Sequence, residues 1–174
     1  MRKLIFICLL FPSIVLAERK DLRFISRTPT VDTSAYAAKD DIGGLMEFAG
    51  LTCPGTKTGS IVGLTLTDKS DNATEYDVVL FKSNPSTSTI TDQAAFDPSD
   101  TDLSRMLPVV NIETTDHFSF NDNGISSVSS LASRAWSTTG TFTDGTIYAA
   151  LVSRGTPTYA ASADITLTLI FECD

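Results

Sequence analysis

Short stretches in which apolar and polar residues alternate recur along the second half of the chain. The pattern is clearest near the end, where Ile165, Leu167, Leu169 and Phe171 occupy every second position. Side chains two residues apart point to the same face of a β-strand, so this spacing predicts strands with one buried face. Alternating or continuously apolar stretches predict strands at Ile61–Thr67, Tyr76–Phe81, Val109–Ile112, Thr146–Val152 and Ile165–Phe171.

Turn-forming residues separate these stretches. Asn121–Gly124 and Asp144-Gly145 are strong turn signals. The segment Asp68–Glu75 is expected to connect two of the predicted strands as a hairpin. Several short strands at this spacing, with little helix between them, predict an all-β fold: a single-domain β-sandwich, jelly-roll-like, over residues 32–174.

One short helix is predicted at Ser99–Leu107. Ser99 precedes Asp102 by three residues, which resembles a capping box with Asp in place of Glu. Apolar residues follow at helical spacing on one face, and Pro108 ends the helix. The stretch Ile125–Trp136 is ambiguous, because its apolar residues also fit one face of a helix.

The amino-acid composition is more typical of β-sheets with solvent-exposed faces than of an enzyme active site. Of the 174 residues, 43 are Ser or Thr, whereas 42% are hydrophobic and 20% are charged. These fractions are ordinary for one globular domain. Threonine favours strands because it is β-branched, and its hydroxyl tolerates solvent, so the composition suits sheets with one solvated face.

The first residues resemble an export signal. Arg2 and Lys3 precede the apolar run Leu4–Ala17, which is too short to span a bilayer as a helix. Residues 1–17 are therefore predicted to be a signal peptide cut after Ala17. The alternative is an apolar leader that is retained, and only in that case is membrane contact expected.

Charge is distributed unevenly along the chain. The net charge is −8, and from residue 28 onward there are 7 basic against 19 acidic residues. An acidic body repels phosphate, so we expect no nucleic-acid binding. Residues 18–31 are predicted to be an extended basic arm. Its candidate partner-docking residues are Arg19, Lys20, Arg23 and Arg27, and the alternative is the positive flank of a solvated leader.

Two cysteines remain once the leader is removed. Cys53 and Cys173 form an even pair, which is what a disulfide in an exported chain requires. Two unpaired thiols are the alternative, because spacing does not determine connectivity. No cysteine or histidine spacing indicates a zinc site, and we predict no cofactor.

Candidate catalytic residues are few. His117 is the single histidine, and neighbours such as Asp116 point to the other face of a strand. Gly55–Ser60 resembles a phosphate loop, but its lysine does not follow the second glycine. The chain is therefore predicted not to be an enzyme. A carbohydrate-active enzyme, which needs paired carboxylates in a cleft, is a minor alternative.

Three further groups of residues carry weaker signals. The acidic cluster of Asp92, Asp97, Asp100 and Asp102 does not match the spacing of an EF-hand loop, so no metal site is predicted. Asn72-Ala73-Thr74 is a glycosylation sequon that we interpret as an ordinary turn. Several aromatic residues suit either a sugar platform or the core, and the core is favoured; they are Phe118, Phe120, Trp136, Tyr148 and Tyr159.

Three stretches resemble a known family: DTSAYAAKDDIGG (Asp32–Gly44), LFKSNPSTSTITDQAAFDPSDTD (Leu80–Asp102) and IYAALVSRGTPTYAASADITLTLIFECD (Ile147–Asp174). Together they resemble small β-rich virion structural proteins of tailed bacteriophages, of the capsid-decoration or head-fibre type. The resemblance implies a non-enzymatic, homo-oligomeric protein on the virion surface, bound to a capsid or other virion protein. The alternative, which rests on the leader, is a secreted or cell-surface bacterial subunit, fimbria-like or adhesin-like.

Overall fold

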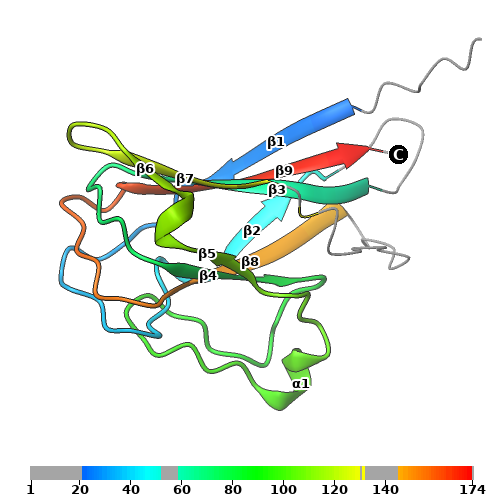
Figure 1. Cartoon of the computed structure of the whole chain (residues 1–174). Coiled ribbons are helices and arrows are strands. Elements are labelled where there is room, and N and C mark those ends of the chain that lie inside the picture. The colour runs from blue at the N-terminus through cyan, green and yellow to red at the C-terminus, as the bar shows by residue number, and fades with distance from the viewer. Residues whose placement is uncertain (1–20, 52–58, 130, 132–144, 174) are drawn as a thin grey trace, which may run out of the picture.

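The computed structural model describes residues 21–51, 59–129, 131 and 145–173. Over these residues the chain folds as two antiparallel sheets packed face to face, as Figure 1 shows. From edge to edge, the first sheet contains β1 (Asp21–Arg27), β9 (Ile165–Cys173), β3 (Gly59–Asp68), β7 (Gly124–Ser129) and β6 (His117–Ser119). The second contains β2 (Met46–Ala49), β8 (Thr146–Ser153), β4 (Tyr76–Phe81) and β5 (Val110–Ile112). Two short helical turns, α1 (Asp100–Leu103) and η1 (Thr114–Asp116), lie in the connections.

The chain passes repeatedly from one sheet to the other. β1 and β3 belong to the first sheet, while β2 between them belongs to the second. The alternation continues through β4 and β5, then β6 and β7, then β8 and finally β9, which is the connectivity of a jelly roll. The predicted all-β sandwich is confirmed. The predicted hairpin at Asp68–Glu75 is wrong, because β3 and β4 lie in different sheets.

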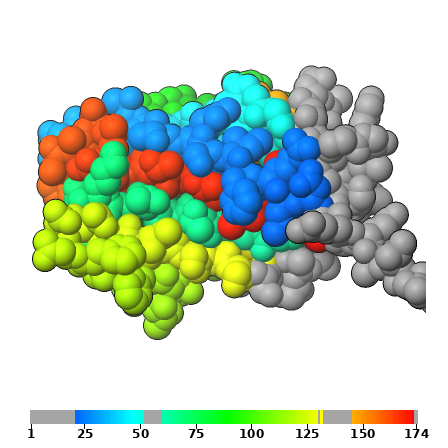
Figure 2. Space-filling model, turned by 90° about the horizontal axis from the view of Figure 1, so that it is seen from above, coloured from blue at the N-terminus to red at the C-terminus, as the bar shows by residue number. Residues whose placement is uncertain are grey.

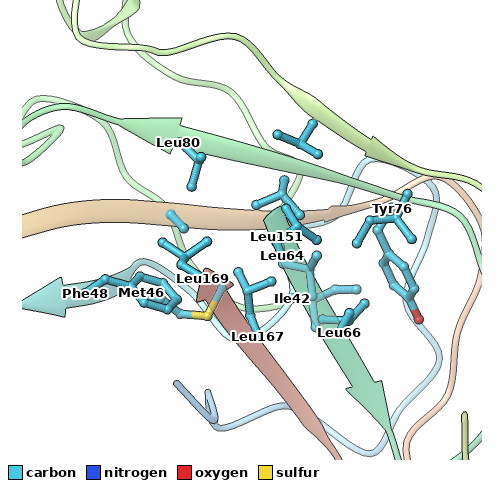
Figure 3. Packing of buried hydrophobic residues seen from close by; sticks show 14 of the residues in the cluster. Ile42, Met46, Phe48, Leu64, Leu66, Tyr76, Leu80, Leu151, Leu167 and Leu169 are labelled. Carbon is cyan, nitrogen blue, oxygen red and sulfur yellow. The ribbon is translucent and has the colours of Figure 1, made fainter. Parts of the chain in front are cut away.

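The main core lies between the two sheets. Alternation along β9 buries Ile165, Leu167, Leu169 and Phe171, as the sequence predicts. Figure 3 shows side chains of β3 and β9 facing those of β4 and β8 across this layer. Burial of such side chains contributes about 1.5–3 kcal/mol each, so this layer is the main source of stability.

A second, smaller cluster covers the other side of β4 and β8. It contains Val79, Phe81, Ala150 and Val152, with Ile90, Phe96, Met106, Val109 and Tyr148 packed against them. Most of these packing residues belong to residues 82–109, which we call the excursion, the long connection from β4 to β5 that Figure 1 shows beneath the second sheet. β4 and β8 are therefore buried on both faces, which explains the unbroken apolar runs at residues 78–81 and 147–152.

The helix is shorter than predicted. α1 covers Asp100–Leu103 instead of Ser99–Leu107, and the Ser99 side chain does not cap it. The Asp102 carboxylate turns inward and binds side chains of the excursion, including Ser99 at 3.2 Å. The amide of Leu107 donates to the carbonyl of Leu80 at 2.8 Å, so the chain is already extended beside β4 where the helix was expected to continue.

Two other predictions need correction. The predicted arm at residues 18–31 includes Asp21–Arg27, which is the edge strand β1 and pairs along its whole length with β9. The helical alternative for Ile125–Trp136 is wrong over residues 125–129, which belong to strand β7, while residues 130 and 132–136 lie outside the described residues. No helix within the described ranges is long and apolar enough to cross a membrane.

Candidate functional site

The described part of the predicted docking arm is tied into the sandwich. Arg23 pairs with Asp21 at 3.1 Å. The Arg27 guanidinium lies 5.7 Å from the centre of the Phe48 ring and donates to the carbonyl of Glu47. Arg27 therefore fastens β1 to β2 across the open edge of the sandwich. Arg19 and Lys20 lie outside the described residues.

The predicted disulfide stays a prediction. The backbone of Cys173 ends β9, where its Cα is opposite those of Asp21 and Gly59 on the two neighbouring strands. Cys53 lies outside the described residues.

His117 lies in a chain of hydrogen-bonded side chains. Its Nδ1 is 3.0 Å from the Ser126 hydroxyl, and its Nε2 is 2.9 Å from an oxygen of Asp71. The hydrogen bond from His117, supported by Ser119, lowers the pKa of Asp71. An added Cβ at Gly124 would overlap the imidazole and the Asp71 carboxylate, so this close approach requires glycine at position 124.

This array is suited to holding loops together. Ser126 is only 2% exposed, so its hydroxyl is not presented to a substrate carbonyl. Asp71 follows β3, whereas His117 and Ser126 belong to β6 and β7. The array therefore ties the β6–β7 hairpin to the connection that crosses between the sheets. Residues adjacent to His117 in the sequence, such as Asp116, do not predict this array. Pairing between strands brings Asp71 and Ser126 to His117 from distant positions.

Asp102 is the centre of a buried polar network. Its side chain is completely buried and accepts hydrogen bonds from Thr87, Ser88, Ser99 and Arg105. Burial opposes ionisation, but these hydrogen bonds outweigh it and hold the pKa of Asp102 at about 2. One carboxylate thus organises both ends of the polar loop before α1.

Asp92 has a similar role, but it joins the excursion to residues 32–43. Its oxygens accept hydrogen bonds from the Tyr36 hydroxyl at 2.6 Å, the Gly43 amide at 2.6 Å and the Asp32 amide at 3.0 Å. The acidic cluster predicted along residues 92–102 is therefore divided, because Asp92 and Asp102 bind different partners. No group of three or more His, Cys, Asp or Glu within the described ranges could hold a metal ion.

Asp41 is the exception among the buried carboxylates. It is 1% exposed, and neither oxygen forms a hydrogen bond of normal geometry. Burial raises the pKa of Asp41 to about 7; the nearby Gly44 amide opposes this shift and the charge of Asp92 adds to it. The carboxyl group therefore titrates much closer to neutral pH than an ordinary aspartate does.

Asn72 has a structural role that agrees with an ordinary turn. Its side-chain amide donates to Asp68 at 3.1 Å, and its carbonyl oxygen accepts from the Thr158 amide at 3.0 Å. A glycan on the Asn72 nitrogen would compete with the contact to Asp68.

The aromatic residues divide between core and surface. Tyr159 is buried and packs edge-on against Tyr36, and Tyr148 packs against the second cluster. The core prediction is wrong for Phe118 and Phe120, which are 63% and 56% exposed and form an edge-on pair with ring centres 5.1 Å apart. Trp136 lies outside the described residues.

The broadest exposed feature is the side of the first sheet that faces away from the core, which we call the outer face (Figure 2). Alternation and strand register place on it Leu22, Phe24, Ser26, Ser60, Val62, Thr65, Thr67, Phe118, Ile125, Ser127, Ser129, Thr166, Thr168, Ile170 and Glu172. Glu172 is the one charged residue in this set. For a chain with 20% charged residues, such a surface is unusually neutral.

Hydroxyl groups occupy the centre of the outer face, and apolar groups occupy two of its corners. Ser26 and Thr168 are hydrogen-bonded at 2.8 Å. Thr28 and Thr166 pair in the same way at 2.7 Å. Low charge together with exposed aromatic residues is typical of the centre of a protein–protein interface.

No family model matches this chain, and no curated protein or solved structure matches it either.

Proposed function

We propose that this chain is a non-enzymatic structural protein on the surface of a virion, bound to a capsid or other virion protein. The observation that carries the proposal is how its side chains are used. The polar groups with reactive chemistry, such as Asp102, Asp92 and His117, are engaged in holding loops. The outer face, in contrast, presents a broad neutral surface to a partner.

Two further arguments support the same function. The resemblance of residues 32–174 to bacteriophage virion proteins rests on stretches that include the excursion and β8–β9. Jelly rolls also recur in viral capsid and lectin domains, although this is an analogy at the level of fold, and fold alone does not determine function.

Quantitative mass spectrometry of particles tests the proposal. Virions would be purified from the source by density gradient, and peptides of this chain would be counted relative to the major capsid protein. We expect a constant ratio across the particle peak. Peptides confined to the soluble or membrane fractions would contradict a virion role.

The N-terminus of the natural protein tests the exported alternative. A chain that begins at Glu18 favours a secreted surface subunit, whereas a retained Met1 favours a virion component. Because Asp21–Arg27 is a strand of the sheet, the docking role of the arm is better tested by charge reversal at Arg19 and Lys20 than by deletion. We expect this variant to fold normally and to lose incorporation into particles.

A further inference from the structure

The exposed apolar residues of the outer face lie at opposite corners. The first corner holds Leu22 and Phe24 of β1, which are 52% and 63% exposed, and Ile170 of β9, which pairs with Phe24. The second corner holds Phe118, paired with Ile125, and the adjacent Phe120. β1 and β6 are the two edges of the sheet, and Figure 2 shows them at opposite sides of this face.

Register places the two corners at opposite ends of the strands as well. Phe24 aligns with Ile170, and Ile170 aligns with Gly63 on β3. Phe118 aligns with Ile125, which aligns with Thr67, four residues further along β3. The corners are therefore diagonal, and the hydroxyl groups lie between them.

We infer that the outer face is a self-association surface through which two copies of this chain pack face to face. A two-fold axis lying between the faces, perpendicular to the diagonal, sets the first corner of each copy on the second corner of the other. Such an interface is closed and yields a dimer. This inference concerns self-association and does not depend on the proposed virion role.

Charge favours a second copy as the occupant of this face. The chain carries a net charge of −8, so two copies repel each other over most of their surfaces. Over the outer face that repulsion is smallest, because Glu172 is the one charged member of the described set. The outer face of a second copy is equally neutral and rich in hydroxyl groups, so the two faces can pack together with little charge repulsion.

Charge also selects the pairing of the corners. Beside the second corner lie Asp116 and the exposed Asp122, whereas at the first corner Asp21 and Arg23 neutralise each other. Packing like corners together would bring the acidic pairs of both copies into contact. Packing unlike corners keeps the acidic turns of the two copies apart, at opposite ends of the interface.

The size of the face indicates a weak dimer. The five strands lie about 4.8 Å apart and average seven residues in length at about 3.3 Å per residue, so the face covers roughly 550 Å² in projection per copy. The accessible surface exceeds this projection because the side chains stand above it, which corresponds to the low end of specific interfaces. A dissociation constant on the order of micromolar is expected.

Sedimentation equilibrium of the full chain from about 1 to 200 μM tests the inference. We expect a monomer–dimer equilibrium. Thr65→Lys and Ser127→Lys, which place a charge in the middle of the face, should each raise the dissociation constant by roughly 30-fold or more. Thr101→Lys is the matched control, because it makes the same charge change on α1, on the other side of the molecule; it should leave the constant unchanged.

A charge-swap series tests the pairing of unlike corners. Phe24→Lys and Phe118→Glu should each weaken the dimer, since each buries an unpaired charge. Both substitutions in one chain should restore it, because the introduced ammonium group of each copy then meets the introduced carboxylate of the other. Both positions are exposed, and circular dichroism would verify that each variant folds.

Each outcome supports or overturns the inference. A wild-type chain that is monomeric at 200 μM, or a dimer that survives both central lysines, would overturn it. Failure of the double variant to recover would overturn the pairing of unlike corners. Particle composition is measured separately, so a failed virion role and a failed dimer are distinguishable.

Discussion

Asp102 and Asp41 are both buried, but their pKa values are shifted in opposite directions. Asp102 is surrounded by hydroxyl, amide and guanidinium donors, and its pKa lies at about 2. Neither oxygen of Asp41 has a hydrogen bond of normal geometry, and the pKa of Asp41 rises to about 7. Burial by itself therefore does not set the charge of a carboxyl group. The number of donors that reach it decides the outcome.

The surroundings of the two residues explain this difference. Asp102 lies on α1, next to a loop rich in Ser and Thr that supplies donors from Thr87 and Ser88. Asp41 lies in a short bridge beside β8, where its neighbour across the bridge is Val152 of the second hydrophobic cluster. Backbone pairing satisfies the amide and carbonyl of Asp41 and leaves its side chain without a well-placed donor.

The largest effect is expected from removing the carboxylate of Asp102. Asp102→Ala leaves the Arg105 guanidinium and several hydroxyl donors without their acceptor, so the melting temperature should fall by on the order of 10 °C. Asp100→Ala changes an exposed residue of the same helix and should change the melting temperature little. Equal losses in thermal unfolding of the two variants would show that the network does not stabilise the excursion.

Removing the charge of Asp41 should stabilise the protein, whereas removing that of Asp102 destabilises it. Asp41→Asn removes the cost of ionising a buried carboxyl group, so the free energy of unfolding at pH 8 should rise by on the order of 3 kcal/mol. Urea denaturation measures this change. The gain should vanish near pH 4, and Asp97→Asn, an exposed control, should show no gain at either pH.

The free energy of unfolding of the wild-type chain should depend on pH through both Asp41 and Asp102. The folded pKa of Asp41 is raised from 3.8 to about 7, so the folded state holds more protons between these values and stability falls as the pH rises through that window. The folded pKa of Asp102 is lowered to about 2, so its contribution is lost as the pH falls from 3.8 towards 2. Asp41→Asn should remove the fall in the free energy of unfolding between pH 3.8 and about 7, and it should leave the loss below pH 3.8 unchanged.

A smaller effect is expected from one donor to Asp102. Ser88→Ala removes one of its charge-assisted hydrogen bonds while several others remain, so the melting temperature should fall by roughly 5 °C. Thermal unfolding measures it. A loss as large as that of Asp102→Ala would mean that Ser88 acts through a contact other than this hydrogen bond.

The smallest expected effect concerns the coupling between Asp92 and Asp41. Asp92→Asn removes a nearby negative charge, which is a minor cause of the raised pKa of Asp41, so that pKa should fall only slightly. Carbon-detected NMR titration of the carboxyl groups reports this directly. A fall to the ordinary value of 3.8 would show that Asp92, and not burial, dominates.

Local patterns predicted the strands with buried apolar residues well, and predicted the exposed or very short strands poorly. Tyr76–Phe81 and Ile165–Phe171 are strands, because buried residues in a strand leave a visible alternation or an apolar run. β1 was interpreted as an arm, because an edge strand exposes Leu22 and Phe24 and carries charges. β6 has only three residues, which is too short to leave a periodic pattern.

The candidate sites were even less predictable. Nothing in the spacing of Asp71, His117 and Ser126 indicates that they meet, since they are separated by 46 and 9 positions. The outer face could not be predicted from the sequence either, because its five strands are not adjacent in chain order.

The amino-acid sequence by itself determined that this chain is built from strands, because the period of two between buried positions is a local property. It also determined the acidic balance and the wealth of hydroxyl groups. Only the tertiary structure decided which aspartate keeps its charge and which residues share the neutral outer face. Both depend on neighbours brought together by sheet pairing, and such neighbours leave no trace in local sequence.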